Sequence, residues 1–217
     1  MLNMDFTQRV VIDTTTQPWV PSPKAGVWRK PLAREEAERG HATSIVRYDA
    51  GASFNGHNHP GGEEILVLEG TFSDETGDFT AGTYFRNPLG FRHSPFSKDG
   101  CLILVKLHQF QPDDEKRIAI QTREGEWHNG PNGARYQILH QHKQEQVVIV
   151  ELPTTTPAIQ HDHPGGEEIY IIKGALKDDK GVYPAGTWLR QPPGSSHAPY
   201  AIEDALLWVK SGHLSPQ

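Results

Sequence analysis

A long stretch of this 217-residue chain occurs twice, with the second copy displaced by 104 residues. Between residues 57–106 and residues 161–210, 22 of the 50 aligned pairs are identical, and no insertion separates them. A repeat of this kind indicates two copies of one structural unit. The sequence therefore predicts two domains, residues 1–112 and 113–217, each of a size that can bury its own core.

The composition within each copy is typical of a β-protein with many turns. The chain contains 21 glycines and 17 prolines, and they separate short runs of apolar and β-branched residues. Residues 43–48, 65–68 and 102–107 are such runs in the first copy, so we expect an all-β fold. Residues 33–40 have a helical composition, and a short helix and a charged turn between strands fit them equally well.

Composition also excludes several functions. The formal net charge of −6 argues against a nucleic-acid partner, which requires a basic surface. No signal sequence and no run of 18 apolar residues is present, so we expect a cytoplasmic protein with no membrane contact. The single cysteine, Cys101, excludes an internal disulfide framework and a cysteine-based zinc module, and we interpret it as a buried structural thiol.

Three histidines and a glutamate recur in one pattern in both copies. His57 and His59 are two residues apart and should project from the same face of a strand. Glu63 keeps this parity beyond a Pro-Gly-Gly turn, and His93 arrives after a second turn at Pro88–Gly90. Imidazole nitrogens with a carboxylate suit zinc, iron, manganese, nickel or copper. The sequence predicts one divalent metal ion in each domain, held by His57, His59, Glu63 and His93 in the first and by His161, His163, Glu167 and His197 in the second.

An arginine and a second glutamate recur beside these ligands, as Arg86 with Glu64 and as Arg190 with Glu168. Glu64 has the opposite parity to Glu63 and should face away from the metal. We therefore favour a structural ion pair between Glu64 and Arg86 across the sheet. The alternative is an arginine that clamps a carboxylate or enolate substrate beside the metal.

The two copies differ just before the last histidine. Phe91 and Arg92 stand where the second copy has Ser195 and Ser196. The pockets beside the two metals should therefore differ, and the smaller serines predict a roomier second pocket.

The spacing of these residues resembles the two signature motifs of the cupin superfamily. The first motif is carried by Gly51, His57, His59, Glu63 and Gly70, and the second by Gly82, Pro88, Gly90 and His93. The chain therefore resembles a bicupin, a tandem pair of double-stranded β-helix, or jelly-roll, barrels. Its Pro-Gly-Gly-Glu-Glu and Gly-Thr-Tyr-Phe-Arg-Asn-Pro runs are similar to the cupin domain of ChrR-type anti-sigma factors.

The resemblance implies zinc at the matching residues of each barrel, with iron, manganese, nickel and copper as alternatives. Known ChrR proteins grip a sigma factor through a helical domain that holds zinc with a cysteine pair. This chain has one cysteine, so we do not expect a sigma factor as its direct partner. Because cupins commonly dimerise, a homodimer is compatible with the resemblance.

Three functions remain open. The first is a regulatory or sensor module, linked to an anti-sigma type of transcriptional stress response, that responds to an oxidant or a small ligand. The second is a metal-dependent dioxygenase that acts with O₂ on a small β-dicarbonyl or enolic substrate. The third is a barrel in which the metal only stabilises the fold.

Overall fold

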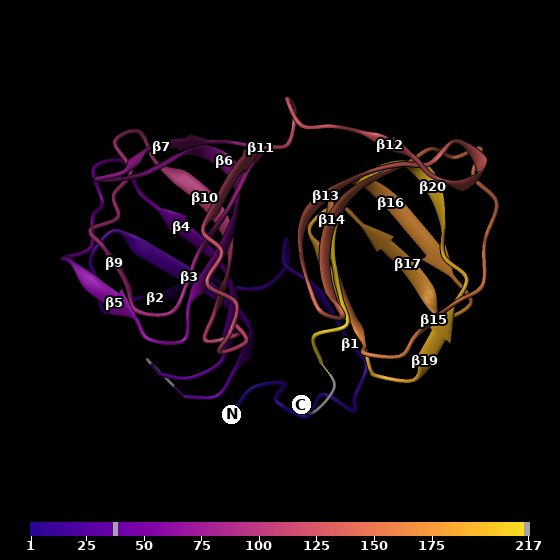
Figure 1. The fold of residues 1–217 in the computed structure, drawn as a ribbon, viewed down its shortest axis with the longest axis horizontal. Coiled ribbons are helices and arrows are strands. Elements are labelled where there is room, and N and C mark those ends of the chain that lie inside the picture. The colour runs from indigo at the N-terminus through magenta and orange to yellow at the C-terminus, as the bar shows by residue number, and fades with distance from the viewer. Residues whose placement is uncertain (37–38, 215–217) are drawn as a thin grey trace. The chain divides into compact units, whose positions relative to one another are not determined.

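The computed structural model describes residues 1–36 and 39–214, and nearly all of their regular structure is β-strand. The chain forms two compact units, Met1–Met4 with Pro18–Glu124 and Asp5–Gln17 with Gly125–Gln217 (Figure 1). The predicted all-β class is confirmed. Within 33–40, the first two residues end a strand and the other described residues form bends. In the described part of the chain, no helix is long and apolar enough to cross a bilayer.

The first unit combines an eight-stranded sheet with a two-stranded sheet, and its strands pair antiparallel. The order in the large sheet is β11-β8-β6-β10-β4-β3-β2, with β7 on β6, while β5 pairs with β9. The strands are β2 (Val20–Pro21), β3 (Val27–Arg34), β4 (Ala42–Tyr48), β5 (His57–His59), β6 (Glu63–Asp74), β7 (Gly77–Thr80), β8 (Thr83–Asn87), β9 (Phe91–His93), β10 (Cys101–Leu107) and β11 (Ile118–Gln121).

The second unit repeats this plan. Its large sheet has the order β1-β18-β16-β20-β14-β13-β12, with β17 on β16, and β15 pairs with β19. The elements are β1 (Val10–Asp13), β12 (His128–Asn129), the 3₁₀ turn η1 (Pro131–Gly133), β13 (Arg135–His142), β14 (Glu145–Leu152), β15 (His161–His163), β16 (Glu167–Asp178), β17 (Gly181–Pro184), β18 (Thr187–Gln191), β19 (Ser195–His197) and β20 (Tyr200–Ser211).

The first strand of each sequence repeat lies in the unit that the other repeat forms. Strand β1 pairs with β18, where Ile12 is opposite Trp188. Strand β11 pairs with β8, where Ile120 is opposite Tyr84. The boundary predicted between residues 112 and 113 describes the repeats of the sequence, whereas each compact unit takes one edge strand from across that boundary.

Inward-facing apolar residues fill each barrel, because alternate residues of a strand share a face. The first core includes Val27, Val46, Ile65, Phe72, Phe85, Cys101 and Ile103, and the second includes Ile169, Ile171, Leu176, Leu189 and Leu207. Cys101 is 5% exposed, and burial raises the pKa of its thiol to about 11. The prediction of a buried structural thiol is confirmed.

Candidate metal centres

The Pro-Gly-Gly turn that precedes each glutamate depends on its second glycine. Gly62 and Gly166 have φ angles of +77° and +74°, a left-handed conformation that favours glycine. A Cβ on Gly62 would lie 2.5 Å from the ring of Phe110, and one on Gly166 would lie 2.7 Å from Leu214 Cδ1. The tight turn therefore lets the chain reverse against a neighbouring segment and return the glutamate toward the histidines.

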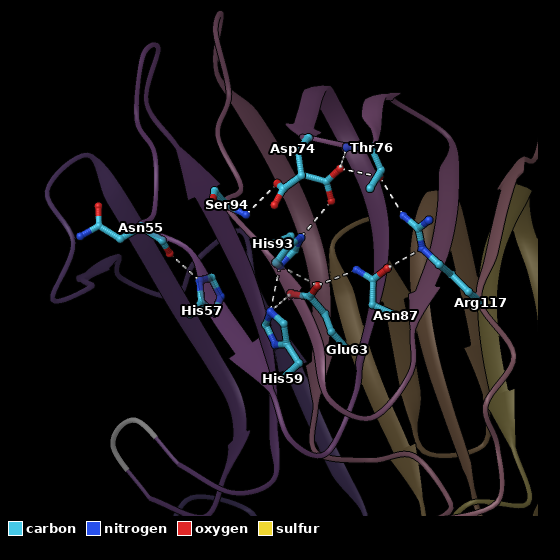
Figure 2. Close-up of polar contacts among 11 residues, drawn as sticks. Asn55, His57, His59, Glu63, Asp74, Thr76, Asn87, His93, Ser94 and Arg117 are labelled. Carbon is cyan, nitrogen blue, oxygen red and sulfur yellow. Dashed lines mark hydrogen bonds and ion pairs between the residues drawn. The ribbon is translucent and has the colours of Figure 1, made fainter.

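The first centre contains all four residues predicted for it. Strand β5 carries His57 and His59, and β9 places His93 opposite His57. One nitrogen of each histidine lies within 4.8 Å of the others. Glu63 Oε1 is 3.6 Å from His59 Nε2, and Glu63 Oε2 is 3.3 Å from His93 Nε2 (Figure 2). Three imidazoles and one carboxylate thus face one small volume.

Hydrogen bonds determine which nitrogen of a histidine faces this volume. A carbonyl oxygen only accepts, so the 2.9 Å contact between His57 Nδ1 and Asn55 O places a proton on Nδ1. His93 Nδ1 likewise lies 3.0 Å from Asp74 Oδ2. Each of these rings, when neutral, keeps the lone pair of its Nε2 for a metal. His59 Nε2 and His93 Nε2 are 2.9 Å apart and point into the same volume (Figure 2).

Burial and charge act differently on the pKa values of the two inner histidines. Burial lowers the pKa of His59, with Glu63 opposing it. Burial also acts to lower the pKa of His93, but the hydrogen bond with Asp74 and the charge of Glu63 outweigh it and raise that pKa. Burial acts to raise the pKa of Asp74, yet hydrogen bonds with His93 and Thr76 lower it. Asp74 is therefore an ionised acceptor at neutral pH.

A polar network supports this centre from outside. Asn87 Nδ2 donates to Glu63 Oε2 at 3.1 Å, and Arg117 Nε donates to Asn87 Oδ1 at 3.4 Å (Figure 2). Arg117 Nη2 also donates to Thr76 Oγ1 at 2.8 Å, and the Thr76 hydroxyl donates to Asp74. Arg117, the residue just before β11, therefore supports both the glutamate and the acid that orients the last histidine.

The second centre groups His161, His163, Glu167 and His197 within the same 4.8 Å limit. Glu167 Oε1 is 3.7 Å from His163 Nε2 and 3.5 Å from His197 Nε2. These three atoms are buried and have no hydrogen-bond partner among the described residues. His161 Nδ1 donates to Ile159 O at 2.9 Å, which keeps its Nε2 for a metal. Because buried polar atoms without partners are costly, their convergence fits a metal ion.

A different network supports the second centre. His197 Nδ1 is 3.7 Å from Asp178 Oδ2 and 3.1 Å from Gln191 Nε2. A half-turn of the Gln191 amide brings its carbonyl oxygen, which has no hydrogen-bond partner among the described residues, to this ring nitrogen. Tyr183 OH donates to Asp178 Oδ1 at 2.6 Å, and Arg9 Nη2 donates to Tyr183 OH at 2.6 Å. Arg9, the residue just before β1, thus corresponds to Arg117, the residue just before β11.

Sequence reasoning missed these supporting residues. Asp74 and Asp178 are identical at the repeat distance, and Asn87 and Gln191 are both amides, so the alignment of the two copies carried a signal for them. Arg9 and Arg117 begin the similar runs Arg-Val-Val-Ile and Arg-Ile-Ala-Ile, which related the two arginines to each other, but only the exchange of edge strands shows which centre each one supports.

Arg86 and Glu64 are opposite each other on β8 and β6, with Arg86 Nε 3.7 Å from Glu64 Oε2. Arg86 Nη1 also pairs with Asp114 Oδ2 at 2.6 Å. In the second unit Arg190 is opposite Glu168. Both arginines are fully buried, and neither lines the cavity beside its metal centre. Their positions favour the structural pairing over the substrate clamp.

A cavity inside each barrel adjoins the predicted ligands. The first has a volume of about 280 Å³ and is lined in part by His57, His59 and Glu63, and the second has about 420 Å³ and is lined in part by His161, Glu167 and His197. The prediction of a roomier second pocket is confirmed, but its reason was wrong. Residues 91–92 and 195–196 line neither cavity. The cavities differ instead at Tyr48, which lines the first, because the equivalent residue in the second is the smaller Leu152 on β14.

Two antiparallel barrels, each with three histidines and a glutamate close together beside its cavity, define a bicupin. The sequence pattern of the ChrR cupin-like domain matches the chain twice, at residues 7–111 and 115–215. The chain therefore belongs to the ChrR cupin-like domain family. None of the curated proteins matches it in sequence.

Solved structures share the fold at low sequence identity. A candidate dioxygenase from Nostoc punctiforme is 19% identical, with a TM-score of 0.78 over 97% of this chain and 85% of its own. Pirin YhhW from Escherichia coli is 14% identical, with a TM-score of 0.70 over 97% of this chain and 100% of its own. Oxalate decarboxylase from Bacillus subtilis is 15% identical, with a TM-score of 0.68 over 95% of this chain and 78% of its own. At these identities the similarity establishes the fold alone.

Proposed function

We propose that this protein is a regulatory or sensor bicupin that binds one divalent metal ion in each barrel. The observation that carries the proposal is the convergence of three imidazoles and one carboxylate in each unit. In the second unit three of the converging atoms are buried without a hydrogen-bond partner among the described residues. Such a donor set is typical of a transition-metal site.

Zinc is the ion that we propose for both centres, since nitrogen and carboxylate ligands in a set of four suit it. When bound, it supplies a Lewis acid beside the cavity. Iron, manganese, nickel and copper are the alternatives that the same donors bind. Among the structural neighbours, oxalate decarboxylase has Mn(II) centres and pirin YhhW was solved with nickel(II).

The sensor role is supported by the cavities and by the family. Each cavity gives a small ligand access to the metal-binding residues of its barrel. The polar networks then connect each centre to the start of an edge strand, through Arg117 just before β11 and Arg9 just before β1. A ligand that shifts these contacts would alter the surface offered to a partner. Such a partner, in an anti-sigma type of stress response, would come from another chain.

The test is metal analysis of the purified protein by mass spectrometry. We expect two zinc ions per chain, one fewer in His59→Ala and one fewer in His163→Ala. His128→Ala is the matched control, because this histidine lies on β12 outside both centres and should leave two ions in place. Full metal retention in either ligand variant would refute the assignment.

A second candidate function, a dioxygenase, is favoured by one observation. His57, His59 and Glu63 form part of a cavity wall, so a small β-dicarbonyl or enolic molecule could reach the metal ligands from inside the barrel. Iron or another redox-active metal at the centre would supply the chemistry for O₂. Oxygen consumption by the iron-loaded protein with such a substrate, abolished in His59→Ala, would support this function. Two tightly held zinc ions and no oxygen uptake with any metal would exclude it.

A further inference from the structure

The two cavities differ in charge as well as in volume. Arg29 and Arg34 line the first cavity, together with the carboxylate of Glu63. In the second, Glu167 is the one lining side chain in the described part of the chain that carries a full charge when the histidines are neutral. Both units offer the same metal-binding set, so the first cavity has two guanidinium charges that the second lacks.

The register of β3 explains why both arginines reach the first cavity. Arg29 is opposite Val46 and Arg34 is opposite Ala42 on β4, and all four residues line the cavity. Residues an odd number of positions apart normally face opposite sides of a strand. A bulge within Pro31–Ala33 shifts the register by one residue and returns Arg34 to the inner face.

The second unit has the same pairing with different side chains. On β13, Tyr136 is opposite Val150 and Gln141 is opposite Gln146. Val150 and Gln146 line the second cavity, as their counterparts do in the first, but Tyr136 and Gln141 do not. The two positively charged positions are therefore particular to the first barrel.

The rest of the first cavity suits an apolar body with one polar end. Its wall includes Val27, Phe54, Ile103, Val105 and Leu107. Tyr48 also lines it, and burial raises the pKa of its phenol well above the usual value, so the hydroxyl stays a hydrogen-bond donor. The volume of about 280 Å³ lies just below the roughly 300–1,000 Å³ range of sites for drug-sized molecules, so the ligand must be small.

We infer that the first barrel binds a small organic carboxylate, whose anionic group is attracted by the positive charges of Arg29 and Arg34 in the cavity wall and whose apolar body packs inside the barrel next to the candidate metal centre. Guanidinium groups bind carboxylates through charge-assisted, often bidentate hydrogen bonds. The second barrel, with a larger and mainly apolar cavity, accepts neutral ligands instead. The inference deepens the proposed function and rests on it for the metal, although the arginine contacts themselves do not require the ion.

Calorimetric titration with benzoate and benzamide tests this inference, because the two probes share size and shape and differ in charge. For the zinc-loaded protein we expect benzoate to bind roughly tenfold or more tightly than benzamide, which corresponds to one strong charged contact. Arg29→Gln and Arg34→Gln should each abolish most of this preference for benzoate over benzamide, while Arg29→Lys should keep part of it. Arg135→Gln, an exposed arginine of β13 paired with Glu151, is the control.

The outcomes separate the inference from the proposed function. Unchanged metal content and circular dichroism in the arginine variants, with benzoate affinity lost, would support it. Benzoate bound as tightly by the Arg29→Gln/Arg34→Gln double variant as by the parent would overturn it, even with both metals present. If the parent protein holds no metal, the proposed function fails. The inference can still be tested on the metal-free protein, where equal affinities for benzoate and benzamide would overturn it.

Discussion

His93 and His197 occupy equivalent positions in the two centres, but different groups hold their Nδ1 atoms and so orient the rings toward a metal. His93 Nδ1 meets the carboxylate of Asp74 at 3.0 Å, whereas His197 Nδ1 is 3.7 Å from Asp178 and has Gln191 as its nearer neighbour. A hydrogen bond to a carboxylate is stronger than one to a neutral amide, so the first centre should orient its last histidine more firmly.

This difference predicts unequal effects of one substitution. Asp74→Asn should weaken metal binding at the first centre by roughly 10- to 100-fold, the usual effect of removing an acid that orients a ligand histidine. Asp178→Asn should weaken the second centre less, because its carboxylate is farther from the ring. Competition with a chromophoric chelator measures both affinities. Equal losses in the two variants would contradict the argument.

The exchanged edge strands are the elements on which the two centres depend. Strand β11 follows the sequence boundary, yet the residue just before it, Arg117, supports the first centre. Strand β1 belongs to the first repeat, yet the residue just before it, Arg9, supports the second centre. Each repeat of the sequence therefore supplies four predicted ligands to one centre and a supporting arginine to the other.

Crossed effects of two substitutions should reveal this exchange. Arg117→Met should weaken the first centre several-fold, and Arg9→Met the second, because each removes hydrogen bonds to the residues that hold the supporting groups of that centre. Metal titrations in a His163→Ala background report the first centre alone, and those in a His59→Ala background report the second. Arg123→Met, an exposed change just after β11, should have no effect. If Arg117→Met instead weakened metal binding only at the second centre, and Arg9→Met only at the first, the exchange would be refuted.

Over the whole molecule, two barrels with separate cores each hold one candidate metal centre. Metal that binds the folded state and not the unfolded chain adds stability by mass action. The last histidine of each centre, His93 or His197, comes from a strand far along the chain from the other three donors, so the unfolded chain does not assemble all four.

Removal of metal should therefore destabilise both barrels. Zinc at a free concentration of 100 times its dissociation constant should add about 2.7 kcal/mol to the free energy of unfolding of a barrel. Urea unfolding followed by circular dichroism, with chelator and after zinc is restored, measures this change. The His59→Ala/His163→Ala double variant should show no response to zinc. Identical unfolding of the parent with and without metal would contradict the prediction.

Much of the architecture could be predicted because local sequence patterns specify it. The repeat indicated two similar units, glycine and proline between apolar runs indicated an all-β chain, and period-two parity placed Glu63 toward the histidines and Glu64 toward Arg86. The eight residues predicted as ligands are brought together for the same reason, since short strands and tight turns fix the direction of their side chains.

Only the tertiary structure decided what surrounds each centre. The pairing of β1 with β18 and of β11 with β8 joins segments far apart in the chain, and no local pattern specifies such a partner. The bulge in β3 changes which face Arg34 occupies, and a shift of one residue reverses every side chain beyond it. The sequence by itself thus determined the repeated fold and the candidate ligands, while non-local pairing and register determined the supporting residues and the charge of each cavity.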